Sequence, residues 1–400
     1  MDEAHMLGRG KHLDIHGYEN PAVIIKRHLD KVCDIAKKYE FKPIIWADMY
    51  FGPWNNGEYV FIDGKKEVPQ YVKDSVHPDV IPVYWDYYSD KQEHYDDMIY
   101  NHKQLWDDIW FAGAVWGWQG FMPLNEYSIK NSVPAIKSCK KNKIKNIFIT
   151  MWGDDGGECP HFAMLPSLMY VAEYLKGNTD EEKIKAKFKR LTGVSFNDFM
   201  LLDKPNQVDM ETTAWFPPNP VKYMFYSDYM SDFLDATVRD GVNSYEYYSN
   251  LAKELYAVGK KTRKYGYLFD TAAKLCEVMQ YKYELGKKTR TAYENGDKAE
   301  LERLAKNEYV KLARNMKKFS LAFEKQWYKE NKPQGFDIQD HRIGGMIHRT
   351  DACRRRILDY VAGRVDSIPE YEEKLLSIYD NKATYIECYR QYATVNVISH

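Results

Sequence analysis

The sequence predicts an α/β fold followed by an α-helical domain, and two observations support this prediction. Up to about residue 176, short apolar runs alternate with longer amphipathic stretches at intervals of roughly 30 to 40 residues, which is typical of a parallel sheet or a β/α barrel. From residue 177 onward, the strand-like runs give way to segments rich in Lys, Glu, Tyr, Leu and Ala with helical spacing. The Tyr, Leu and Met side chains of these segments are expected to pack between helices.

The apolar runs are interpreted as strands that are covered on both faces, because they are continuously apolar. They comprise residues 43–47, 80–85, 113–118 and 146–152. Helices are expected between them, over residues 20–39, 94–111, 126–141 and 161–175. Asn20 is expected to cap the first of these, with Pro21 at its first helical position. In the second half, helices are expected over residues 244–264, 267–295, 297–329, 337–363 and 368–392.

The composition excludes several classes of protein. The chain of 400 residues is 44% hydrophobic and 29% charged, which argues for a folded protein and against intrinsic disorder. Its 57 Lys and Arg balance 58 Asp and Glu, so no global field is present to recruit nucleic acid or an anionic membrane. The longest apolar runs are too short for a transmembrane helix. The six cysteines contain no CxxC pair and are expected to be small buried hydrophobes.

Each predicted strand ends in tryptophan beside a hydrogen-bonding group, and in a β/α barrel the strand ends carry the chemistry. These groups are Trp46 with Asp48; Trp85 with Asp86, Tyr87 and Tyr88; Trp116 and Trp118 with Gln119; and Trp152 with Asp154, Asp155 and Glu158. Together they describe an apolar pocket with polar groups, which suits a pyranose ring, because its CH faces pack on indole and its hydroxyls bind carboxylates. The alternative is an aromatic plug that caps the barrel.

Several motifs resemble one family. Asp2-Glu3-Ala4-His5, at a position where another strand would end, resembles the catalytic Asp-Glu motif of family 20 glycoside hydrolases, the β-N-acetylhexosaminidases. The segments 46–49, 85–88 and 151–157 resemble the ends of that family's fifth, sixth and eighth strands. In the helical part, the segments 218–223, 332–336 and 342–345 resemble the subgroup with a helical C-terminal domain.

The resemblance implies the C-terminal portion of a (β/α)8 TIM barrel over residues 1–176, from the end of strand four to helix eight, and an α-helical domain over 177–400. A full barrel takes about 250 residues, so the N-terminal part of the barrel is expected to be missing. An alternative interpretation follows from this expectation. The chain would then be a truncated, inactive remnant that acts as a carbohydrate-binding or helical dimerisation module.

The activity implied by the resemblance is exo-acting hydrolysis of terminal non-reducing β-linked GlcNAc or GalNAc. The 2-acetamido oxygen of the sugar would act as nucleophile and form an oxazolinium intermediate. Glu3 would be the general acid and base, and Asp2 would orient the acetamido group. The residues implied to bind the sugar are Trp46, Trp85, Tyr87, Tyr88, Trp116, Trp152 and Asp154. Tyr87 or Tyr88 would bind the acetamido oxygen, and Asp154, where many relatives have Glu, would bind outer hydroxyls.

No cofactor and no metal are expected. His5, His12 and His16 lie near Asp14, but their spacing matches no standard zinc signature. The expected partner is an amino-sugar glycoside, and the resemblance suggests a homodimer through the helical domain. The scattered cysteines and the subgroup resemblance favour a cytoplasmic location.

Overall fold

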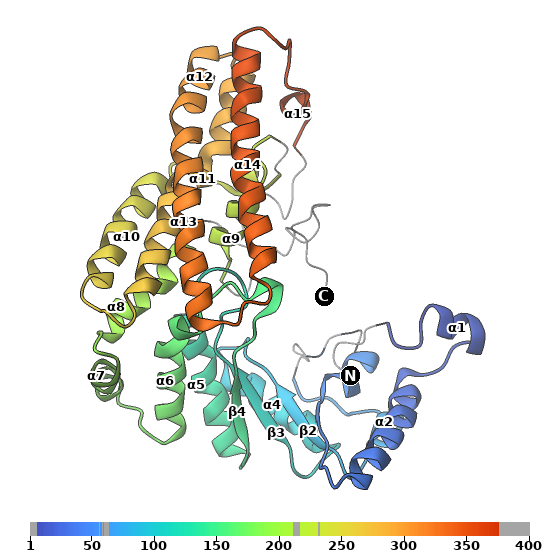
Figure 1. Ribbon diagram of the computed structural model, residues 1–400. Coiled ribbons are helices and arrows are strands. Elements are labelled where there is room, and N and C mark those ends of the chain that lie inside the picture. Colours follow the sequence, from blue (N-terminus) through green and yellow to red (C-terminus); the bar gives the residue numbers. More distant parts are fainter. Residues whose placement is uncertain are drawn as a thin grey trace. The chain divides into compact units, whose positions relative to one another are not determined.

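The computed structural model describes residues 6–55, 57, 59, 64–210, 217–230 and 233–375. The chain divides into two compact units (Figure 1). The first unit comprises Met1–Val115, Ser128–Thr150 and Tyr170–Asn178, and the second comprises Trp116–Tyr127, Met151–Met169 and Thr179–His400. Both units are discontinuous in sequence, and the domain boundary expected between residues 176 and 177 stays a prediction.

The first unit contains a four-stranded parallel sheet in the order β1-β2-β3-β4. Its strands are β1 (Ile44–Trp46), β2 (Ile81–Trp85), β3 (Trp110–Ala114) and β4 (Ile147–Thr150). Trp46 lies opposite Val83, and Trp85 lies opposite Ala112, which in turn lies opposite Phe148. The predicted alternation of strands and helices is therefore present, whereas the part of the chain that is described shows an open sheet and not a closed barrel.

The third strand lies earlier in the sequence than predicted. It covers Trp110–Ala114 and not residues 113–118, because the aromatic Trp110 and Phe111, which favour strands, already pair with the sheet. One further ladder bond follows, from Val115 N to Thr150 O at 3.0 Å. Trp116 therefore lies two residues beyond the strand.

Helices pack on one face of this sheet. They are α2 (Pro21–Lys38), α4 (Gln92–Lys103) and α5 (Asn125–Lys141), with the short α3 (Gln70–Lys73), whereas α1 (Lys11–His16) has no buried residue. Leu29 of α2, Met98 of α4 and Cys139 of α5 join Phe111 in one buried cluster. As predicted, Asn20 caps α2, since its side-chain oxygen accepts a hydrogen bond from Ala22 N at 2.9 Å. The later part of α6 (Leu165–Leu175) adds Val171 and Tyr174 to a second cluster.

The second unit is helical. Its elements are α7 (Glu181–Thr192), α8 (Phe196–Met200), α9 (Pro220–Tyr226), α10 (Ser244–Gly259), α11 (Gly266–Glu294), α12 (Lys298–Lys306), α13 (Glu308–Glu330), α14 (Phe336–Val361) and α15 (Pro369–Glu372). The longest of these, α11, packs against α10, α12 and α13, and α14 packs against α12 and α13 (Figure 1). The single helix predicted over 297–329 is two helices, which are separated at Asn307.

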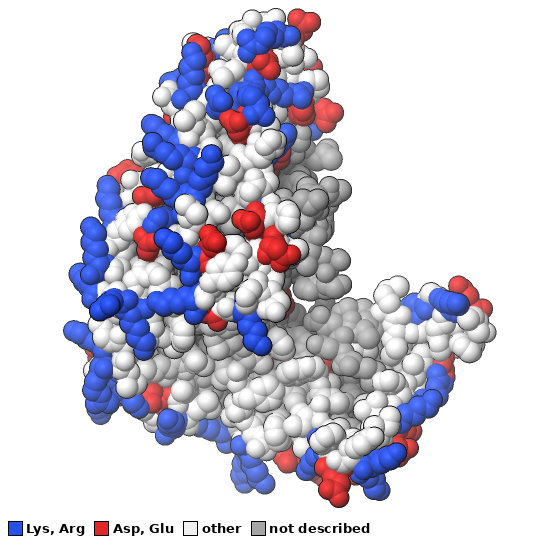
Figure 2. Space-filling model, in the orientation of Figure 1, with Lys and Arg blue, Asp and Glu red and all other residues white. Residues whose placement is uncertain are grey.

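Charges of both signs are mixed on the surface of the helical unit. Figure 2 shows many Lys and Arg side chains on the face in view, with Asp and Glu among them. Arg303, for example, forms ion pairs with Glu300 and Glu308 at 2.6 Å each. Within the described ranges, no helix is long and apolar enough to cross a membrane. Five cysteines, Cys33, Cys139, Cys159, Cys276 and Cys353, are buried free thiols, as expected.

A histidine lies in the core of the first unit. His102 of α4 is fully buried, with ring centroids 4.3 Å from Phe51 and 4.6 Å from Tyr84. Its Nδ1 donates to Met98 O at 2.7 Å, and its Nε2 has no hydrogen-bond partner in the part of the chain that is described. Burial lowers the pKa of this imidazole to about 4, so the native state holds it neutral.

This histidine should make the first unit sensitive to acid. Between its unfolded pKa of 6.5 and its folded pKa of about 4, only the unfolded state binds the proton, so the free energy of unfolding falls as the pH falls. We expect the parent to lose about 2 to 3 kcal/mol more than His102→Phe between pH 7 and pH 4.5. Urea unfolding at the two pH values measures this difference. An equal pH dependence in the two proteins would contradict the buried neutral histidine.

Candidate functional site

At the end of β2, a buried carboxylate shapes the segment that carries Tyr87 and Tyr88. Asp86 is completely buried and accepts hydrogen bonds from Tyr84 Oη at 2.8 Å and from Tyr88 N at 3.1 Å. His94 Nε2 lies 2.6 Å from the same carboxylate. Burial and the neighbouring Asp86 raise the pKa of the Tyr84 hydroxyl well above its ordinary value, so this hydroxyl stays a donor. Asp86 is thus engaged by the protein itself.

The structure brings three of the predicted site residues together. The Trp85 and Tyr87 rings stack with centroids 5.6 Å apart, and the Tyr87 and Tyr88 centroids are 4.7 Å apart. Tyr87 is buried, while Trp85 and Tyr88 are partly exposed. Asn131 of α5 holds the main chain here, because its Nδ2 donates to Tyr87 O at 2.8 Å.

Trp46, at the end of β1, shares a sheet face with Trp85. The register puts Trp46 beside Val83, and Trp85 follows Val83 by two residues, so both indoles project from the same side of the sheet. Phe148 of β4 also belongs to this face, and its ring centroid is 5.9 Å from that of Trp46. Side chains from the first and last strands therefore meet on the face opposite the helices.

The remaining aromatic candidates belong to the second unit. Trp116 stacks on Trp118 with centroids 4.2 Å apart and meets the edge of Tyr127 at 5.0 Å. Only 1% of Trp116 is exposed, so its neighbours already cover its ring. Asn219 of the loop before α9 supports this segment, since its Nδ2 donates to Gln119 O at 2.9 Å.

The segment after β4 is anchored by buried charges of the same unit. Glu158 forms ion pairs with Lys222 Nζ of α9 at 2.5 Å and with Arg342 Nη1 of α14 at 3.3 Å, and all three side chains are at most 2% exposed. Gln339 of α14 donates from Nε2 to Gly156 O at 2.9 Å. A carboxylate in such surroundings is expensive to bury unless it is paired.

Two predicted sugar ligands precede this anchor. Trp152 is partly exposed and Asp154 is exposed, at the start of the 3-10 turn Asp154–Gly156. Asp154 is therefore accessible to a ligand, and Glu158 is not. Sequence reasoning did not single out Lys222, Gln339 or Arg342. Lys222 and Arg342 lie in the motifs 218–223 and 342–345, but nothing in either motif alone shows that both side chains reach one carboxylate.

The predicted catalytic pair and the histidines near the N-terminus do not form a site in the described residues. Asp2 and Glu3, the predicted catalytic pair, lie outside the described residues, as does His5. His12 pairs with Glu19 at 3.2 Å, and its ring lies 4.8 Å from that of His16. In the described ranges, no group of three or more His, Cys, Asp or Glu side chains is placed to hold a metal ion.

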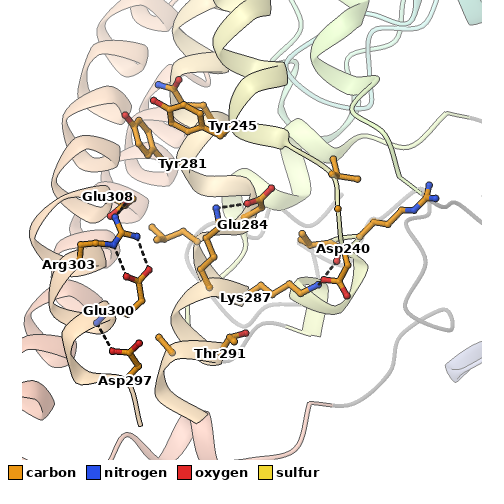
Figure 3. A pocket seen from close by; sticks show the side chains of 18 of the residues that line it. Asp240, Tyr245, Tyr281, Glu284, Lys287, Thr291, Asp297, Glu300, Arg303 and Glu308 are labelled. Carbon is orange, nitrogen blue, oxygen red and sulfur yellow. Dashed lines mark hydrogen bonds and ion pairs between the residues drawn. The ribbon is translucent and has the colours of Figure 1, made fainter. Parts of the chain in front are cut away.

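A separate cavity of about 490 Å³ lies in the helical unit between the start of α10 with the segment before it, the C-terminal half of α11, and α12 (Figure 3). Its charged side chains are paired with one another. Lys287 contacts Asp240 at 2.7 Å, and Lys288 contacts Glu284 at 2.5 Å. The lining of the cavity contains none of the predicted sugar-binding residues.

Comparison with known families gives a match over the helical unit. Residues 197–388 match the Glycoside Hydrolase 20C C-terminal domain. The matched range is a little less than half of the chain. The matched range includes Asn219, Lys222, Gln339 and Arg342, which contact the segments 116–120 and 152–158. No curated protein matches the chain.

A substitution at Gly156 would test how closely the segment 152–158 packs against α14. Its φ of +118° is rarely adopted by other residues, and a Cβ there would lie 2.7 Å from Gln339 Nε2 and 3.0 Å from Arg342 Nη1. We expect Gly156→Ala to cost about 1 to 3 kcal/mol of stability. The matched control is Gly344→Ala within α14, where a Cβ meets no atom within 4 Å. This variant should gain about 0.5 to 1 kcal/mol. Thermal or urea unfolding measures both, and equal stabilities of the two variants would contradict the packing around Gly156.

Proposed function

We propose that this chain is an exo-acting β-N-acetylhexosaminidase that releases terminal, non-reducing β-linked GlcNAc or GalNAc. The match of residues 197–388 to a family 20C glycoside hydrolase domain carries the proposal. The tryptophans and tyrosines at the ends of adjacent parallel strands in the first unit agree with it, because such rings pack against sugar CH faces.

The catalytic domain in this proposal is a (β/α)8 barrel of which the four-stranded sheet is one arc. Two observations support this. Within the described residues, β1 is an edge strand and Ile44 is 46% exposed, which is unusual for a parallel sheet. In addition, Trp46 and Phe148 meet on the face away from the helices, as inward-pointing side chains do in a barrel.

The proposed mechanism uses the substrate's own acetamido group. Its carbonyl oxygen forms a bond to the anomeric carbon while the bond from that carbon to the leaving oxygen breaks. Glu3 gives its proton to the leaving oxygen, and Asp2 accepts a hydrogen bond from the acetamido N–H and stabilises the positive oxazolinium. Glu3 then takes a proton from water as the water attacks the anomeric carbon, which restores the acetamido group with retained configuration.

The remaining residues would bind and orient the sugar. Tyr87 or Tyr88 would donate to the acetamido oxygen, and the exposed carboxylate of Asp154 would accept from outer hydroxyls. The indoles proposed to enclose the ring are Trp46, Trp85 and Trp152, with Trp116 as the buried support of Trp118.

Replacement of the proposed general acid tests the assignment. We expect Glu3→Gln to lower kcat for p-nitrophenyl N-acetyl-β-glucosaminide by about 10² to 10⁴, because the leaving oxygen would receive no proton. Glu93→Gln, which changes an exposed carboxylate at the start of α4, is the matched control and should keep parental activity. Retention of most activity by Glu3→Gln would refute the role of Glu3.

An inhibitor separates this mechanism from one with an enzyme nucleophile. A thiazoline analogue of the oxazolinium should inhibit the parent competitively and bind more tightly than the substrate, because it resembles the intermediate. Inhibition kinetics and calorimetry measure this. An active enzyme that is indifferent to the thiazoline would contradict substrate assistance. Binding of the thiazoline without turnover would favour the carbohydrate-binding remnant.

A further inference from the structure

Two segments of the second unit carry predicted sugar ligands, and helices or loops of the same unit bind both of them. The segments are 116–120 and 152–158. Asn219 fixes the main chain at Gln119, while Lys222, Gln339 and Arg342 fix the main chain and the carboxylate at the end of the segment 152–158. All four side chains are buried, with relative exposures of 2% or less. These polar side chains are therefore shielded from solvent, and their polar contacts include these two segments.

The segment 152–158 needs such support because of its sequence. Gly153, Gly156 and Gly157 lie between Trp152 and Glu158, and glycine-rich backbone has many conformations of similar energy. Gly156 and Gly157 both have positive φ. Within the segment, the main-chain bond from Gly157 N to Asp154 O is long, at 3.5 Å. Gln339 at Gly156 O and the ion pairs of Glu158 therefore restrain this segment from outside it.

We infer that Gln339, Arg342 and Lys222 are positioning residues that place Asp154 and Trp152, so that the helical domain sets selectivity at the sugar's outer hydroxyls. The inference rests on the proposed function, since Asp154 is a proposed ligand of those hydroxyls. Gluco and galacto sugars differ in the orientation of one such hydroxyl, so a displaced Asp154 changes how well the two are distinguished.

Gln339 is the residue best suited to a test. Replacement of Glu158, Lys222 or Arg342 leaves a buried charge without its partner and endangers folding. Gln339→Met keeps the length and bulk of the side chain and removes only the donor to Gly156 O. The ion pairs of Glu158 remain in this variant.

The matched control is Thr350→Val on the same helix. Thr350 is fully buried, and its hydroxyl bonds to Tyr229 Oη at 2.5 Å and to Met346 O at 2.7 Å, not to the segment 152–158. Both variants therefore remove buried hydrogen bonds from α14, but only Gln339→Met removes one that reaches the proposed sugar-binding segment.

The first measurement compares kcat/KM for p-nitrophenyl N-acetyl-β-glucosaminide and the corresponding galactosaminide. We expect Gln339→Met to change the ratio of the two values by at least about threefold, mainly through KM, while Thr350→Val keeps the parental ratio. A smaller folded fraction lowers both activities equally and cannot change this ratio. An unchanged ratio in Gln339→Met overturns the role in selectivity.

The second measurement does not depend on turnover. Hydrogen exchange of the amides in residues 153–158 should be at least about tenfold faster in Gln339→Met than in the parent and in Thr350→Val, because the segment loses a hydrogen bond that restrains it. Equal exchange in all three proteins overturns the positioning role, even in an active enzyme. A parent that hydrolyses neither substrate refutes the proposed function and the selectivity with it, whereas the exchange result still decides whether Gln339 restrains the segment.

Discussion

The second unit depends on the burial of one carboxylate between two cations. Glu158 brings the segment after β4 into the interior of the helical unit, where Lys222 and Arg342 receive it from two different helices. Removing one charged residue from such a group costs much more folding free energy than the whole group contributes, because the remaining charges stay buried without a counter-ion. The three residues therefore specify where α9, α14 and the segment meet, more than they add to stability.

The first unit also contains a buried carboxylate that is held by several partners. Asp86 is buried beneath the aromatic segment that follows β2, and it gathers a tyrosine hydroxyl, a histidine nitrogen and a main-chain N–H. In both units, a buried carboxylate close in sequence to the proposed ligands is bound by the protein itself. Asp86 accepts a hydrogen bond from Tyr88 N, and Glu158 is held by Lys222 and Arg342.

Much of the architecture could be predicted from local patterns, because apolar runs and helix caps are local signals. Asn20 and Pro21 marked the start of α2, and the four parallel strands appear in the predicted order. The position of β3 was wrong, since periodicity could not show that Trp110 pairs with the sheet while Trp116 leaves it. The burial of Trp116 on Trp118, and the pairing of Glu158 with residues 64 and 184 positions later, depend on long-range packing that no local pattern contains.

The segments 116–120 and 152–158 belong to the helical unit, although both precede residue 177 in the sequence. A protein cut at that residue would retain Lys222 and Arg342 and lose Glu158, and it would also lose Gln119, whose main chain binds Asn219. Two like charges would then share a buried site without their counter-ion. The helical unit thus includes residues supplied by the preceding sequence, and a boundary drawn at residue 177 would divide its interior.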